Sequence, residues 1–158
     1  MILSSSIDGV RAGRALGFGL ADAENCTVFA GRRLPAAAAA AVFDELEGYF
    51  SGLPTCAALA GSLLAPYVPL LACRGWALEV VPPGPDASDL ALLARADFFI
   101  RRGYTDAVVA SGDGIFAALA DRVRVHVVSH PDRLSRKLAQ AATSVHLLRS
   151  GTGNPMAA

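Results

Sequence analysis

Residues 106–114 read Asp-Ala-Val-Val-Ala-Ser-Gly-Asp-Gly, an apolar run that ends in an acidic, glycine-rich turn. A second apolar run, 16–21, ends in the same way, with Asp22-Ala23-Glu24-Asn25. Short apolar runs bounded by turn residues are typical of buried strands in a parallel sheet. Because α/β sheets bind ligands at the carboxyl ends of their strands, both turns are expected to face a ligand-binding crevice.

The rest of the chain alternates between expected strands and expected helices, punctuated by glycine and proline. The expected strands are 16–22, 55–61, 76–81, 106–110 and 123–128, with a last apolar segment at 145–148. The expected helices are 36–50, 63–74, 115–121, 134–142 and one that starts at Asp86 or Ser88 and runs to about 102. This alternation predicts an α/β fold with a doubly wound, mainly parallel sheet flanked by helices. In its simplest right-handed form, strands 16–22 and 106–110 are neighbours.

Length and composition indicate one compact domain. Of the 158 residues, 53% are hydrophobic and 18% charged, which favours a single domain over 15–149 with a flexible N-terminal segment 1–14 and a flexible tail 150–158. No apolar stretch reaches the roughly 18 uncharged residues of a membrane span, and no secretory leader pattern opens the chain. We therefore expect a cytoplasmic protein without a membrane partner.

Charge and cysteine content exclude several function classes. The formal net charge is zero, so no global attraction to nucleic acid is expected, and basic residues cluster only locally. The cysteines are three and widely spaced, which suggests neither a disulfide framework nor a zinc site. The first turn lacks G-x-G-x-x-G, and Ser111 lacks the glycine two positions before it that a nucleophile elbow requires.

The acidic turns suggest metal chemistry. Adjacent strands lie about 4.8 Å apart, so the carboxylates of Asp22 and Asp113 can reach one ion, and Asp89 in the preceding helix is a third candidate ligand. Each of these candidate ligands also has a purely structural alternative role. Asp22 can form a turn, Asp113 can cap a helix, and Asp89 can be a first-turn carboxylate that interacts with the helix dipole. Carboxylates held together repel one another unless a cation or a shared proton compensates, and this cost favours a functional site.

These motifs resemble the NYN domain of the PIN-like nuclease superfamily. The similarity rests on Asp22-Ala23-Glu24-Asn25, on the stretch 86–92 (Asp-Ala-Ser-Asp-Leu-Ala-Leu), on 111–116 (Ser-Gly-Asp-Gly-Ile-Phe) and on 134–138. The resemblance implies a PIN-like fold and a ribonuclease in which Asp22, Asp89 and Asp113 hold Mg²⁺ or Mn²⁺, with Asn25 beside them as a polar residue of the site. Two family acids are replaced, by Arg95 and Ile115.

The leading hypothesis is therefore a metal-dependent ribonuclease that acts on single-stranded or looped RNA. In it, Asn25 and Ser111 position water or phosphate, while the nearby arginines Arg32, Arg33 and Arg136 contact the RNA backbone. The replacement of two acids favours an alternative, a catalytically silent module that binds RNA or a protein. A small-ligand domain is a third hypothesis, and the alanine run 36–41 leaves a homodimer open, although core burial explains that run more economically.

Overall fold

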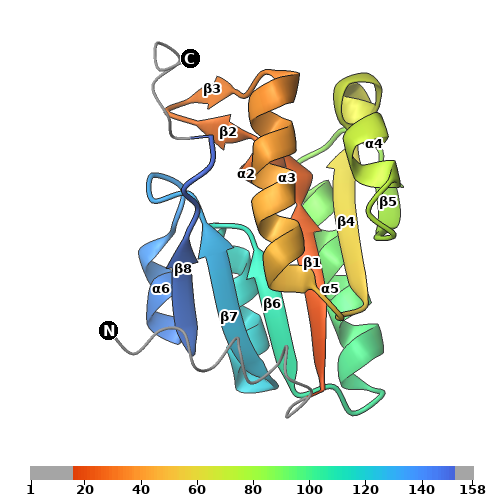
Figure 1. The fold of residues 1–158 in the computed structure, drawn as a ribbon. Coiled ribbons are helices and arrows are strands. Elements are labelled where there is room, and N and C mark those ends of the chain that lie inside the picture. Colours follow the sequence, from red (N-terminus) through yellow and green to blue (C-terminus); the bar gives the residue numbers. More distant parts are fainter. Residues whose placement is uncertain (1–15, 152–158) are drawn as a thin grey trace.

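The computed structural model describes residues 16–151 and has a parallel six-stranded sheet at its centre. The strand order is β5-β4-β1-β6-β7-β8, so the order reverses beside β1, as the sequence predicts (Figure 1). β1 pairs with β6 from Gly17 opposite Asp106 to Ala21 opposite Ala110. The strand bounds are β1 (Gly17–Asp22), β4 (Thr55–Ala60), β5 (Ala77–Val81), β6 (Asp106–Ala110), β7 (Arg124–Ser129) and β8 (Ser144–Leu147).

Helices cover both faces of the sheet, which gives the expected three-layer fold. One face carries α3 (Ala36–Phe50) and α4 (Leu64–Ala72), the latter preceded by the 3-10 turn η1 (Gly61–Leu63) (Figure 1). The other face carries α5 (Ala87–Ile100), the 3-10 helix η2 (Gly114–Asp121) and α6 (Arg136–Ala141). Each face has its own buried apolar core.

The alternation of side chains along β1 separates these two cores. Phe18 and Leu20 pack toward α5 and η2, whereas Ala21 belongs to the core beneath α3. Gly19 lies on the α3 side, where a Cβ atom would come within 2.6 Å of the Phe50 ring. Glycine in the strand therefore makes room for an aromatic side chain of the covering helix.

Several local features differ from the sequence-based expectations. The polar loop after Asp22 contains a short helix, α2 (Ala23–Cys26), and a two-stranded hairpin of β2 (Val28–Phe29) and β3 (Arg32–Arg33). The expected side-chain cap of α5 is wrong: Asp86 occupies the N-cap position, but at φ 56° its side chain makes no capping hydrogen bond. The extended backbone that lets a cap reach the first-turn amides is absent there.

The ends of the chain need separate mention. The expected flexible segments 1–14 and 150–158 lie outside the described residues, apart from Ser150 and Gly151. No helix within 16–151 is long and apolar enough to cross a membrane.

Candidate metal and phosphodiester site

Asp22 is the last residue of β1 and lies at the carboxyl edge of the sheet, beside the strand-order reversal. Its carboxylate is 5% exposed and caps α2, accepting a hydrogen bond from the Asn25 backbone N–H at 3.1 Å. Asp22 therefore does have the expected role of a turn former. It uses Oδ1, and each carboxylate oxygen has a second lone pair for a further partner.

The acidic turn after β6 is bonded directly to the turn after β1. The Ser111 hydroxyl is fully buried, donates to Asp22 Oδ2 at 3.3 Å and accepts from the Asp113 backbone N–H at 3.2 Å. The Asn25 side-chain oxygen accepts from the Gly112 backbone N–H at 2.9 Å. Asn25 and Ser111 thus hold the two turns together at the crevice and orient Asp22.

Asp89, the third residue of α5, brings a second carboxyl group to Asp22. It is 8% exposed, and its protonated carboxyl is placed to donate a hydrogen bond to the Asp22 carboxylate. Burial first, and then the charge of Asp22, raise the pKa of Asp89 to about 7. Burial also raises the pKa of Asp22, against the hydrogen bond from the Asn25 backbone amide. In the absence of a cation, the pair therefore takes up a proton as the pH falls through about 7.

Two buried oxygen atoms beside this pair have no hydrogen-bond partner among the described residues. They are Asp89 Oδ1 and Ser88 Oγ, and Ser88 is 6% exposed. A buried oxygen without a partner costs about 1–3 kcal/mol, which is the kind of cost that a bound ligand removes. Sequence analysis missed Ser88, since a serine in a first helical turn is usually read as a cap.

Asp113 lies at the margin of the pair. Its Oδ1 accepts from the Ile115 backbone N–H at 2.9 Å and so caps η2, and its charge contributes to the raised pKa of Asp89. Within residues 16–151, no group of three or more His, Cys, Asp or Glu side chains is close enough to hold a metal ion. The structure therefore brings two of the three expected acids together and gives the third a capping role.

Gly112 of the second turn is required by nearby backbone, whereas Gly114 faces side chains. A Cβ atom on Gly112 would lie 2.2 Å from the Arg133 carbonyl oxygen, and one on Gly114 would lie 3.1 Å from Ser135 Oγ. The Ser135 backbone N–H also donates to the Gly112 carbonyl at 2.8 Å. The loop between β7 and α6 therefore packs tightly on this turn and fixes Asp113.

The arginines expected to contact RNA lie on elements at the same end of the sheet. Arg32 and Arg33 form β3, in the hairpin that projects beyond the strand ends, and Arg136 opens α6; all three are exposed (Figure 1). Arg33 is anchored, since its Nη1 donates to the Glu24 carbonyl at 3.1 Å and to Thr27 Oγ1 at 2.8 Å.

Arg95 and Ile115, at the two positions where the NYN resemblance leads one to expect an acid, have other contacts. Arg95 forms an ion pair with Glu79 of β5, and Ile115 packs partly buried against the core beneath α5 and η2. Neither side chain supplies a ligand that could substitute for the missing acid.

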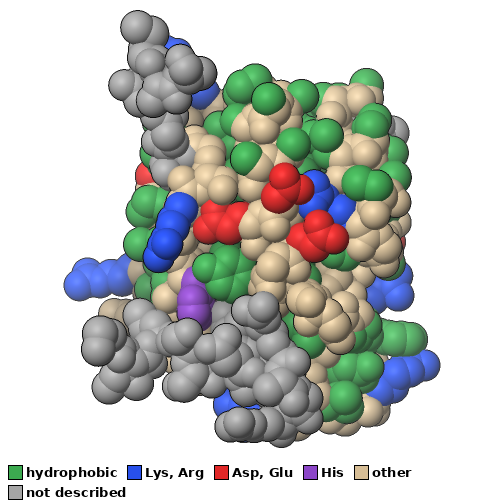
Figure 2. All heavy atoms as spheres, viewed as in Figure 1, with side chains coloured by type: hydrophobic (Ala, Val, Ile, Leu, Met, Phe, Trp, Pro, Cys, Tyr) green, Lys and Arg blue, Asp and Glu red, His purple; other side chains and the backbone are tan. Residues whose placement is uncertain are grey.

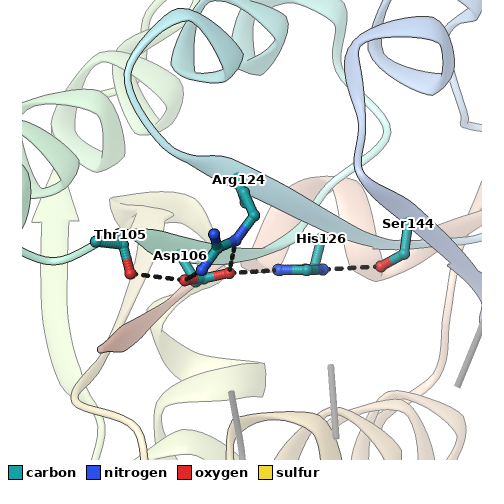
Figure 3. Close-up of polar contacts among 5 residues, drawn as sticks. All are labelled: Thr105, Asp106, Arg124, His126 and Ser144. Atoms are coloured by element: carbon teal, nitrogen blue, oxygen red, sulfur yellow. Dashed lines mark hydrogen bonds and ion pairs between the residues drawn. The ribbon is translucent and has the colours of Figure 1, made fainter. Parts of the chain in front are cut away.

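A second polar cluster lies at the opposite, amino end of the sheet (Figure 3). Asp106 accepts from Arg124 Nε and Nη2 at 2.9 and 2.7 Å, and its Oδ1 lies 2.9 Å from His126 Nε2. The other ring nitrogen of His126 lies 2.9 Å from Ser144 Oγ. Ser144, His126 and Asp106 are linked in the order of a Ser-His-Asp catalytic triad, but Ser144 is only 3% exposed. The cluster therefore joins the starts of β6, β7 and β8 and is not accessible for catalysis.

The alanine run on α3 is only partly buried. Ala39 is in the core, whereas Ala36, Ala37 and Ala41 are exposed, so core burial explains only part of the run. Figure 2 shows acidic side chains gathered at the middle of this face with basic side chains beside them. Arg74, for example, pairs with Asp44 and Glu47 at 2.7 Å each. The charges of Arg74, Asp44 and Glu47 are thus paired with one another.

Comparison with known proteins supports the fold alone. No protein-family model and no curated protein sequence matches the chain. Among solved structures, a protein of unknown function from Vibrio parahaemolyticus is similar, with a TM-score of 0.66 and 15% sequence identity over 87% of this chain and 95% of that one. The chain therefore shares a three-layer α/β fold with a protein that carries no assigned activity.

Proposed function

We propose that the protein is a metal-dependent ribonuclease of the PIN-like type, with Asp22 and Asp89 as its central acids. One observation carries the proposal: two buried carboxyl groups meet at the switch point of a doubly wound sheet, and one of their oxygens, Asp89 Oδ1, has no hydrogen-bond partner within residues 16–151. Ligands of such sheets bind at this point.

The donor set suits Mg²⁺ or Mn²⁺, because it consists of oxygen atoms and carries negative charge. Asp22 and Asp89 would hold the ion, Asp113 would act from the margin, and water would complete the coordination. A bound ion of this kind polarises a phosphoryl oxygen and lowers the pKa of a bound water. With two central carboxylates, we propose a single ion.

The protein's own side chains supply positioning. Asn25 and Ser111 fix the orientation of Asp22 through the hydrogen bonds between the two turns. Arg32, Arg33 and Arg136 on the rim would contact the phosphates of single-stranded or looped RNA, which bends more readily into a narrow crevice than a duplex does. The proposal places the enzyme in the cytoplasm and leaves its oligomeric state, monomer or homodimer, to experiment.

Cleavage of a labelled RNA in the presence and absence of Mn²⁺ tests this function. Asp22→Asn keeps the size of the side chain and an oxygen that can still cap α2, so the fold should persist while metal-stimulated cleavage is lost. Asp44→Asn on α3 is the matched control, because the Asp44 side chain is 70% exposed and pairs with Arg74 instead of with the candidate site. Equal cleavage by wild type and Asp22→Asn would remove the assignment.

A catalytically silent RNA- or protein-binding module is the second candidate. It is favoured by the absence, within 16–151, of a three-acid group and by Asp113 capping η2. It predicts that wild type binds RNA with the same affinity in EDTA and in Mn²⁺, and cleaves in neither.

A further inference from the structure

A hollow of about 300 Å³ lies at the edge of the molecule between α5 and β5. We call it the α5 edge pocket, and it is lined by Glu79, Ala91, Ala94, Arg95 and Phe98. We propose that this pocket binds one nucleobase of single-stranded RNA. The ligand class rests on the proposed function, whereas the location rests on the chemistry of the pocket.

Phe98 provides a stacking surface at this pocket. It is 40% exposed, although two arginine side chains of the same helix region lie over its ring. Guanidinium groups flank the ring: the Arg102 carbon Cζ lies 3.5 Å from its centroid and that of Arg95 lies 5.7 Å away. Unpaired bases stack on aromatic rings and on guanidinium planes, and the positive charge attracts the phosphate backbone.

The floor and the side of the pocket suit a flat, polar-edged ligand. Ala91 and Ala94 have small side chains, so a planar ring can approach α5 closely. The ion pair of Arg95 and Glu79 stands at the side, with the two side chains 34% and 35% exposed. It offers donor and acceptor groups next to each other, and a base edge carries both kinds of group. Sites for small planar ligands typically combine an apolar wall with a few fixed polar groups.

The pocket lies on the side of α5 opposite the pair of acids. Phe98 follows Asp89 by nine residues in the same helix, which is about 13.5 Å of rise and two and a half turns. Accordingly Asp89 is 8% exposed and Phe98 is 40% exposed. A base held in the α5 edge pocket would therefore anchor the RNA on the protein, and it would not by itself set which phosphodiester bond is cleaved.

Binding of a fluorescein-labelled ten-nucleotide RNA, measured by fluorescence anisotropy in EDTA, tests the pocket without cleavage. Phe98→Leu keeps an apolar side chain but removes the stacking surface, and it should weaken binding at least about fivefold, since stacking of one base contributes about 1–3 kcal/mol. Phe98→Tyr keeps the ring and should bind as wild type does. Leu90→Ala is the matched control, because Leu90 is 58% exposed on the same helix outside the pocket.

The outcomes separate the pocket from the nuclease. Wild-type affinity in Phe98→Leu, or no binding by wild type, would overturn the pocket. Cleavage in Mn²⁺ together with binding that does not depend on Phe98 would keep the nuclease and reject the pocket. Binding that depends on Phe98 without cleavage in Mn²⁺ would keep the pocket and reject the nuclease. Urea unfolding of Phe98→Leu verifies that the variant is folded.

Discussion

Replacing Asp89 by asparagine should stabilise the metal-free protein at alkaline pH. The buried carboxyl group has a pKa of about 7 in the folded protein against an ordinary value of 3.8. At about 1.4 kcal/mol per pH unit, this difference corresponds to at most about 4 kcal/mol of unfolding free energy. Asparagine resembles the protonated carboxyl group, since it can still donate a hydrogen bond to Asp22, but it carries no charge.

The direction in which stability changes with pH depends on which state of the protein, folded or unfolded, holds the Asp89 proton. Between pH 4 and pH 7 the folded protein keeps the Asp89 proton while the unfolded chain has lost it, so wild-type stability falls as pH rises through this range. The gain from Asp89→Asn should therefore be largest, up to about 4 kcal/mol, at pH 8 and less than about 1 kcal/mol at pH 4.

Urea unfolding in EDTA at the two pH values measures this difference. Asp97→Asn is the matched control on the same helix: Asp97 pairs with Arg101 and Arg122 at 2.6 and 2.9 Å, and its pKa is lowered, chiefly by the Arg122 hydrogen bond. That variant should not gain stability at pH 8. If Asp89→Asn is no more stable than wild type at pH 8, or if its gain does not shrink on acidification, burial and the charge of Asp22 do not raise the pKa of Asp89 as described.

Two further substitutions test the packing around the sheet. Gly112→Ala should destabilise the fold by several kcal/mol or prevent folding, because its Cβ would lie 2.2 Å from the Arg133 carbonyl oxygen. Gly48→Ala in α3, where nothing lies within 4 Å of the added Cβ, should raise the unfolding free energy by about 0.5–1 kcal/mol. Urea titration measures both changes. Burial acts to raise the pKa of Asp106, but the hydrogen bonds led by that from Arg124 outweigh it and lower the pKa. Asp106→Asn should therefore cost stability at pH 7, and thermal melts should show the deficit shrinking as pH falls below 4. A deficit independent of pH would contradict that ion pair.

The order of the elements could be predicted from the sequence, because apolar runs mark the strands and helices, and the glycines and prolines between them mark their ends. Gly75 and Gly103 adopt positive φ angles of 72° and 87° after α4 and α5, as expected for residues that end helices. The hairpin of β2 and β3 could not be predicted, since its strands have two residues each and its turn uses Ala30 at φ 50°. Asp132 stabilises that turn from 102 positions away in the chain, accepting from the Ala30 backbone N–H at 2.9 Å.

The candidate site likewise has parts that could be predicted from the sequence and parts that could not. Asp22 was predictable because it ends a central strand, and the neighbouring position of β6 followed from handedness. The orientation of the Asp113 side chain could not be predicted, because it depends on one hydrogen bond. The Asp113 carboxylate accepts from the Ile115 amide and so caps η2 instead of turning toward Asp22 and Asp89. The Asp106 cluster had a signal that was overlooked: β6, β7 and β8 each begin with a polar residue, and these align at one edge only after the sheet forms.

Calorimetric titration of the metal-free wild type with Mn²⁺ at pH 7.5, with Asp89→Asn alongside, is the most direct measurement of whether the two carboxyl groups hold a cation. We expect one saturable binding event in wild type, accompanied by proton release from the pair, and none in Asp89→Asn. No binding in wild type, or equal binding in both proteins, would contradict the metal site and with it the proposed ribonuclease.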